Sequence, residues 1–200
     1  RSISGDRDTH ILEYMLSFPI SLSDYYWGKF LGRFATVFIP VFFAMIVALI
    51  IGLFKDAPLP IGIFLLYSGL LFALSLSFLG IAFIISSVVK SSEVALGISF
   101  FIWIVLLAFI DIALISLMMQ NRMSEEVIIG LSLINPMEVF RVAAISLFDP
   151  ELTVMGPVAY TILDNIKLPF FITFSIIYPS LIGLGLAWLG YFIFKKTDLI

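Results

Sequence analysis

Four long apolar stretches constrain this 200-residue chain more than any other feature. They lie at residues 34–54, 61–88, 94–118 and 168–194, and Ile, Leu, Phe, Val and Ala dominate each of them. About 20 helical residues cross the hydrocarbon core of a bilayer. None of the stretches alternates polar and apolar residues as a barrel strand would. Because backbone groups in lipid must bond within their own segment, the sequence predicts an all-α integral membrane protein, a helical bundle.

Composition excludes several other classes of protein. Hydrophobic residues make up 62% of the chain and charged residues 12%, which a small soluble fold could not accommodate. There is no cysteine, and the single histidine, His10, is too few for a typical zinc site. The net charge of −3 offers no basic surface to nucleic acid. We therefore expect no metal, no cofactor bound by this chain and no nucleic-acid partner.

The basic residues predict an orientation for the four spans. Seven lie on one side of the bundle, which the positive-inside rule makes cytoplasmic, and four lie on the other. We expect a multi-pass protein of the cell's inner membrane, with both ends of this sequence in the cytoplasm. The seven are Arg1, Arg7, Lys29, Arg33, Lys90, Lys195 and Lys196, and the four are Lys55, Arg122, Arg141 and Lys167.

The same pattern predicts four regions along the chain. Residues 1–33 form a cytoplasmic segment, 34–118 three transmembrane helices, 119–167 an extracytoplasmic segment with short amphipathic helices, and 168–200 the last span and a tail. In the opening segment we expect a short apolar helix, capped by Thr9 and ended by Pro19, along the membrane surface. In the outer segment, Asn135 is a predicted helix cap, with Pro136 at the first position and Glu138 facing back toward the cap.

Three short motifs follow one another in the opening segment. Their sequences are GDRDTHILE at residues 5–13, LSFPIS at 16–21 and GKFLG at 28–32. Their order and spacing resemble the cytoplasmic segment between the second and third spans of ABC-2 type transporter permeases. The chain departs from the commonest pattern at His10, where Gly is frequent, and at Leu22, where Arg is frequent. On the residues alone, an ordinary interfacial helix that anchors the fold remains the alternative.

The resemblance implies a coupling helix that docks on a separate cytoplasmic ATPase subunit, which holds ATP and Mg²⁺. It also implies two further spans before Arg1, so that the four visible spans belong to six. It further implies a pair of permeases, which we expect to be a homodimer of this chain, although a pair of two different permeases is the alternative. The chain has no GxxxxGK(S/T) loop, so we expect a transport subunit and not an enzyme. The residues to which the resemblance assigns ATPase coupling are Asp6, Arg7, Glu13, Leu16 and Pro19.

Asp111 stands inside the third predicted span, where an acid is costly and is a functional candidate by default. A structural clasp to a neighbouring helix is the simpler interpretation. The spacing of Trp103 and Asp111, and the motif Asn135-Pro136-x-x-x-Phe140-Arg141, resemble the branch that contains the permease of nitrous oxide reductase maturation. That resemblance implies a periplasmic partner, contacted through Asn135, Pro136 and Arg141, and a role in maturing a copper enzyme.

Two other function classes compete with the permease. An ion-gradient-driven secondary transporter would use Asp111, but such proteins are built from repeated halves and no internal repeat is visible. An intramembrane enzyme needs clustered catalytic groups, whereas Asp111 stands alone in its span. The methionines at positions 118, 119 and 123 could ligate Cu(I), although Met more commonly fills gaps in apolar cores.

Overall fold

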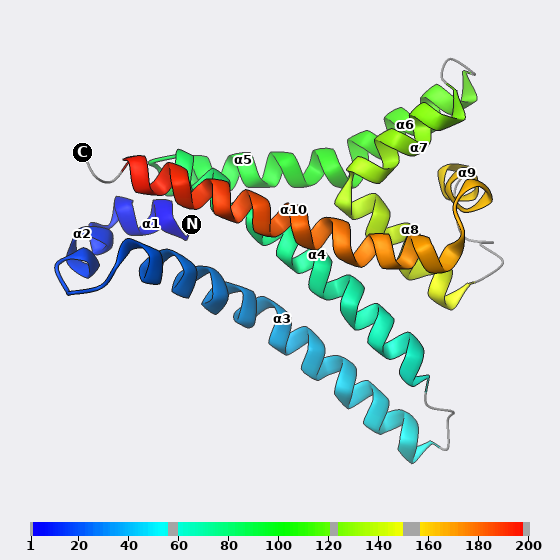
Figure 1. Cartoon of the computed structure of the whole chain (residues 1–200), viewed down its shortest axis with the longest axis horizontal. Coiled ribbons are helices and arrows are strands. Elements are labelled where there is room, and N and C mark those ends of the chain that lie inside the picture. Colours follow the sequence, from blue (N-terminus) through cyan, green and yellow to red (C-terminus); the bar gives the residue numbers. More distant parts are fainter. Residues whose placement is uncertain (1, 56–59, 121–123, 150–156, 198–200) are drawn as a thin grey trace. The chain divides into compact units, whose positions relative to one another are not determined.

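In the computed structural model of the chain, all the described elements are helices (Figure 1). The structure describes residues 2–55, 60–120, 124–149 and 157–197. Within these ranges four helices are long and apolar enough to cross a membrane: Leu22–Phe54, Ile61–Val88, Ser92–Leu117 and Leu168–Thr197. The predicted all-α membrane protein with four visible spans is thereby confirmed.

The chain divides into two compact units. The first comprises Arg1–Val41, Ser75–Ile102 and Ser180–Ile200, and the second comprises Phe42–Leu74 and Trp103–Pro179. Three long helices, α3 (Leu22–Phe54), α4 (Ile61–Val88) and α10 (Leu168–Thr197), contribute residues to both units. The candidate sites lie one in each unit, so each unit is described by itself.

The first unit is built around a cluster of aromatic rings. Besides parts of α3, α4 and α10, it contains α1 (Ile3–Asp8), α2 (Ile11–Leu16) and most of α5 (Ser92–Ile104). Tyr26, Phe30 and Phe83 are buried, and the ring of Phe83 meets the other two edge-on, with centroids 5.5 and 5.1 Å away. The Tyr26 hydroxyl donates to the Ala187 carbonyl at 2.7 Å, which satisfies the polar atom of this buried ring.

Within the first unit, the backbones of α4 and α10 touch. A Cβ atom added to Gly80 would lie 2.1 Å from the Gly183 carbonyl oxygen. One added to Gly183 would lie 2.3 Å from the Leu76 carbonyl oxygen. No side chain fits at either position, so glycine sets the closeness of this crossing.

Besides parts of α3, α4 and α10, the second unit contains the end of the third span and the short helices that follow it. It contains η1 (Val105–Phe109), a π-helical turn, then α6 (Ile110–Met119), α7 (Glu125–Ile134), α8 (Pro136–Phe148) and α9 (Pro157–Asn165). Helices α7 and α8 are bent by 100° at the break between them and together have the composition of a broken span or a re-entrant loop. The core of this unit includes Leu114, Ile128, Val142 and Ile162 from the short helices and Phe171 from α10.

Several predicted boundaries differ from those observed. Helix α3 begins at Leu22, in agreement with the helix start that the sequence indicates at residues 21–24, and the Ser21 hydroxyl accepts from the Asp24 amide at 3.0 Å as its cap. The helix continues past residue 33, the expected end of the cytoplasmic segment, into the first span. Helix α1 was not predicted. Thr9 does not cap α2: its hydroxyl donates back to the Gly5 carbonyl at 2.8 Å. His10 occupies the cap position with a φ of 56°.

Candidate functional site

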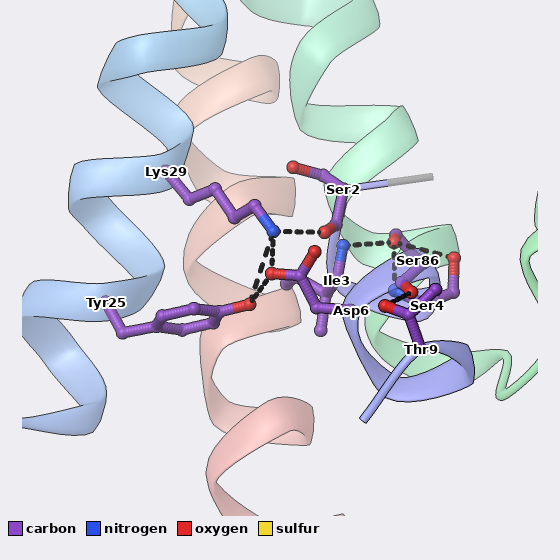
Figure 2. A network of polar contacts seen from close by, with 9 residues as sticks. Ser2, Ile3, Ser4, Asp6, Thr9, Tyr25, Lys29 and Ser86 are labelled. Atoms are coloured by element: carbon purple, nitrogen blue, oxygen red, sulfur yellow. Dashed lines mark hydrogen bonds and ion pairs between the residues drawn. The ribbon is translucent and has the colours of Figure 1, made fainter. Parts of the chain in front are cut away.

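A network of polar contacts fixes α1 to the first unit (Figure 2). The Asp6 carboxylate accepts from the Lys29 ammonium and from the Tyr25 hydroxyl, both of which belong to α3. Lys29 also donates to the Ser2 carbonyl at 2.6 Å. The side chains of Lys29 and Asp6 are only 21% and 18% exposed, so this ion pair is screened less than a surface pair.

The N-terminal turn of α1 is bound to α4. The Ser86 hydroxyl oxygen accepts from the Ile3 and Ser4 amides, each at 2.9 Å, and lies 3.1 Å from the Ser4 hydroxyl (Figure 2). A helix leaves its first amide groups without partners within the helix, and here a side chain of another helix supplies them. Ser4 and Ser86 are both buried.

The two charged residues that follow Asp6 bind the ends of two further helices. Arg7 donates through Nη1 to the Ser87 carbonyl at 3.0 Å, at the C-terminal end of α4. The Asp8 carboxylate accepts from the Ser92 amide at 2.5 Å, at the N-terminal end of α5. Each charge complements the helix dipole that it meets. Three consecutive side chains of α1 thus contact three different helices.

Helix α2 presents a mostly exposed surface. The Glu13 side chain is 78% exposed and lies 3.3 Å from His10 Nδ1. Tyr14 and Phe18 are exposed and pack edge-to-face at 5.3 Å, and Pro19 is exposed as well. Solvent-exposed aromatic side chains side by side are typical of an interaction surface.

A groove opens beside this surface. It has a volume of about 540 Å³ and combines apolar with charged side chains of both signs. Its apolar wall comes from α2 and the turn after it, and its charged wall comes largely from α3. The lining residues are Asp6, Ile11, Met15, Ile20, Asp24, Tyr25, Gly28, Lys29 and Arg33.

The five predicted coupling residues fall into three groups. Asp6 and Arg7 point inward and bind other helices of the first unit. Leu16 is half-buried against the aromatic cluster. Glu13 is exposed on α2, and Pro19 is exposed in the turn that follows it. Three of the five residues therefore fix α1 and α2 to the first unit, and the other two lie at an exposed surface. The role of all five in binding an ATPase stays a prediction.

The second unit holds an ion cluster. Arg141 of α8 donates to both carboxylate oxygens of Asp111 on α6, through Nη1 to Oδ2 and through Nη2 to Oδ1, the latter at 2.7 Å. Nη2 also donates to Glu138 Oε2 at 2.6 Å. This two-pronged geometry is the strong form of a carboxylate–guanidinium contact. The pair agrees with the clasp interpretation of Asp111. Glu138 does not fold back to the cap as expected but binds Arg141.

Asn135 joins the same cluster to the π-helical turn. Its side-chain oxygen accepts from the Met137 amide at 3.0 Å, which confirms the predicted cap of α8. Its Nδ2 donates to the Leu106 carbonyl at 2.7 Å, in η1. Asn135 and Pro136 are buried. The residues predicted to contact a periplasmic partner thus make contacts inside the second unit.

Sequence reasoning missed Lys29, Ser86 and Glu138 as site residues. Only the motif around Lys29 gave any signal, through the resemblance, since the partners are far apart in the chain. Of the methionines considered as copper ligands, Met119 is exposed at the end of α6, the side chain of Met118 is not described, and Met123 lies outside the described residues.

Comparison with known proteins gives one informative result. A family model described as "ABC-2 family transporter protein" matches residues 1–199. A comparison with curated proteins found no match.

Proposed function

The chain belongs to the ABC-2 family of transporter proteins, and from this premise we propose that it is the membrane-spanning permease subunit of an ABC transporter. Members of this family are multi-pass membrane subunits of transporters and are not themselves catalytic. The sequence has no phosphate-binding loop of the GxxxxGK(S/T) type. The energy therefore comes from a separate cytoplasmic ATPase, which holds ATP and Mg²⁺.

The exposed surface of α2 is the observation that carries this proposal. It offers Tyr14, Phe18 and Pro19 together with the charge of Glu13, which is a chemistry suited to a protein groove. The open groove beside it adds apolar and charged side chains to the same face. In our proposal the ATPase docks here.

The contacts of α1 provide a route from this surface to the bundle. Helices α1 and α2 pack against each other, so a displacement of α2 acts on α1. This displacement then reaches α3, the end of α4 and the start of α5 through the hydrogen bonds of Asp6, Arg7 and Asp8, respectively. Charged hydrogen bonds are strong and directional enough to move these helices together. ATP-driven motion at α2 would thus reach three spans through one short helix.

Reversing one exposed charge tests the docking. We expect Glu13→Lys in the full-length protein to abolish co-purification of the ATPase in mild detergent, because the exposed carboxylate meets the partner directly. Glu93→Lys is the matched control: Glu93 is also exposed in the first unit, at the start of α5. Equal recovery of the ATPase with both variants would refute docking at α2.

The finer assignments are part of the same proposal. We place the protein in the inner membrane, as a homodimer with two ATPase subunits and with the opening segment in the cytoplasm, on the distribution of basic residues and the family. The Asn135-Pro136 motif supports a role beside a periplasmic partner in copper-enzyme maturation. Recovery of such a partner in the same purification tests it.

A secondary transporter that uses Asp111 remains the competing function. In such a protein Asp111 would exchange its ion during transport, and the Arg141 guanidinium that binds both of its oxygens would compete with that ion. Transport into vesicles under an ion gradient without ATP would favour this alternative, and its strict dependence on ATP would exclude it.

A further inference from the structure

The ion cluster of the second unit contains more acidic than basic side chains. Two acidic side chains, Asp111 and Glu138, share one guanidinium, that of Arg141. With both acids ionised the cluster holds one net negative charge. Glu138 is 3% exposed and Asp111 is 18% exposed. An uncompensated buried charge in a membrane protein is costly, and among the described residues no second cation binds this cluster.

One oxygen of the cluster has no donor. Glu138 Oε1 is buried, and no hydrogen-bond donor of the described residues reaches it. The carboxyl groups of Glu138 and Asp111 nevertheless bind the same guanidinium nitrogen, Arg141 Nη2, at 2.6 and 2.7 Å. Two ionised carboxylates held this close repel each other, whereas one protonated and one ionised group do not. The geometry thus has a place for one proton between two acids.

We infer that Asp111 and Glu138 jointly bind one exchangeable proton beneath Arg141, and that this proton neutralises the cluster. The charged groups that act on Glu138 in the described part of the chain are Asp111 from α6 and Arg141 from its own helix. Glu126 of the adjacent α7 is exposed. The proton belongs to the pair and not to either residue, as in other closely coupled carboxyl groups. This inference is independent of the proposed function.

The donor set favours a proton over a metal cation. Asp111 directs both oxygens to Arg141, and Glu138 directs one, so a single carboxylate oxygen stays available. Hard cations require about six oxygen ligands. Within the described residues no cluster of three or more Asp, Glu, His or Cys side chains has metal-binding geometry.

Infrared spectroscopy of the full-length protein in lipid nanodiscs tests the inference. A protonated carboxyl group has a carbonyl-stretch band distinct from that of a carboxylate. We expect one such band at neutral pH that is lost as the pH rises. Glu138→Gln and Asp111→Asn should each remove it entirely, because the remaining acid then pairs with Arg141 alone and ionises. Glu126→Gln, which alters an exposed acid on α7, should leave the band unchanged.

Three results would overturn the inference. The first is absence of the band in the unmodified protein. The second is its persistence in either Glu138→Gln or Asp111→Asn, which would show that the two acids do not share the proton. The third is a titration midpoint that shifts when choline replaces Na⁺, which would make the ligand a metal cation. The two variants alter different helices, so the test stands if one of them fails to fold.

Discussion

At the scale of single residues, α1 shows how a short polar helix can be held among apolar ones. Its residues 6–8 each bond to a different helix, and its first amides bond to Ser86. The resemblance to ABC-2 permeases selected Asp6 and Arg7 and assigned them to contact with an ATPase, whereas in the structure both bind other helices of the same unit. Their partners lie 23 and 80 residues away, and no local pattern indicates such pairs.

Removing the ammonium of Lys29 tests the α1 contacts. Lys29→Met removes one of the two donors to Asp6, its countercharge, and the donor to the Ser2 carbonyl, so we expect a loss of about 1–3 kcal/mol in unfolding free energy. Thermal unfolding in detergent measures it. Lys195→Met, at an exposed lysine of α10, should change little. In the double variant Asp6→Asn/Lys29→Met the losses should be less than additive; full additivity would mean that the two side chains do not interact.

At the scale of secondary-structure elements, the long transmembrane helices could be predicted from hydropathy. The span predicted at residues 61–88 matches α4, and the one at 168–194 differs from α10 by three residues, because long apolar runs have few alternatives in lipid. The π-helical turn η1 was not predicted. Its Leu106 carbonyl accepts a hydrogen bond from Asn135, which lies 29 residues further along the chain, and no local sequence pattern indicates such a contact. Helix α1 was missed because its six residues include three charged ones and no apolar periodicity.

The crossing of α4 and α10 offers a prediction at this scale. Gly183→Ala places a methyl group 2.3 Å from the Leu76 carbonyl oxygen, so the helices must separate. We expect a loss of about 1–3 kcal/mol in unfolding free energy, measured by thermal unfolding in detergent. Gly185→Ala, two residues further along α10, meets no atom within 4 Å and should be neutral or slightly stabilising. Similar losses in both variants would mean that helix propensity, not the crossing, sets the cost.

At the scale of the whole molecule, the number of spans fixes the arrangement of the connections. With the bent α7–α8 pair counted as a re-entrant loop, four spans would place the opening segment and the end of α10 on one side of the membrane, and the α3–α4 and α9–α10 connections on the other. None of the residues in the 18-residue window that qualifies α3 as a span is buried by the described part of the chain, so this part of the helix faces lipid or another protein. The proposed second copy would account for part of that apolar surface.

Single cysteines can test this topology because the sequence has none of its own. We expect Glu13→Cys and Lys196→Cys to react with a membrane-impermeant maleimide only in inside-out vesicles. Lys55→Cys and Lys167→Cys should react only in right-side-out vesicles, since one span separates each from a cytoplasmic connection. Reaction of all four from the same side would contradict four crossings. The reverse pattern would keep the four crossings but invert the protein, and would place α2 beyond the reach of a cytoplasmic ATPase.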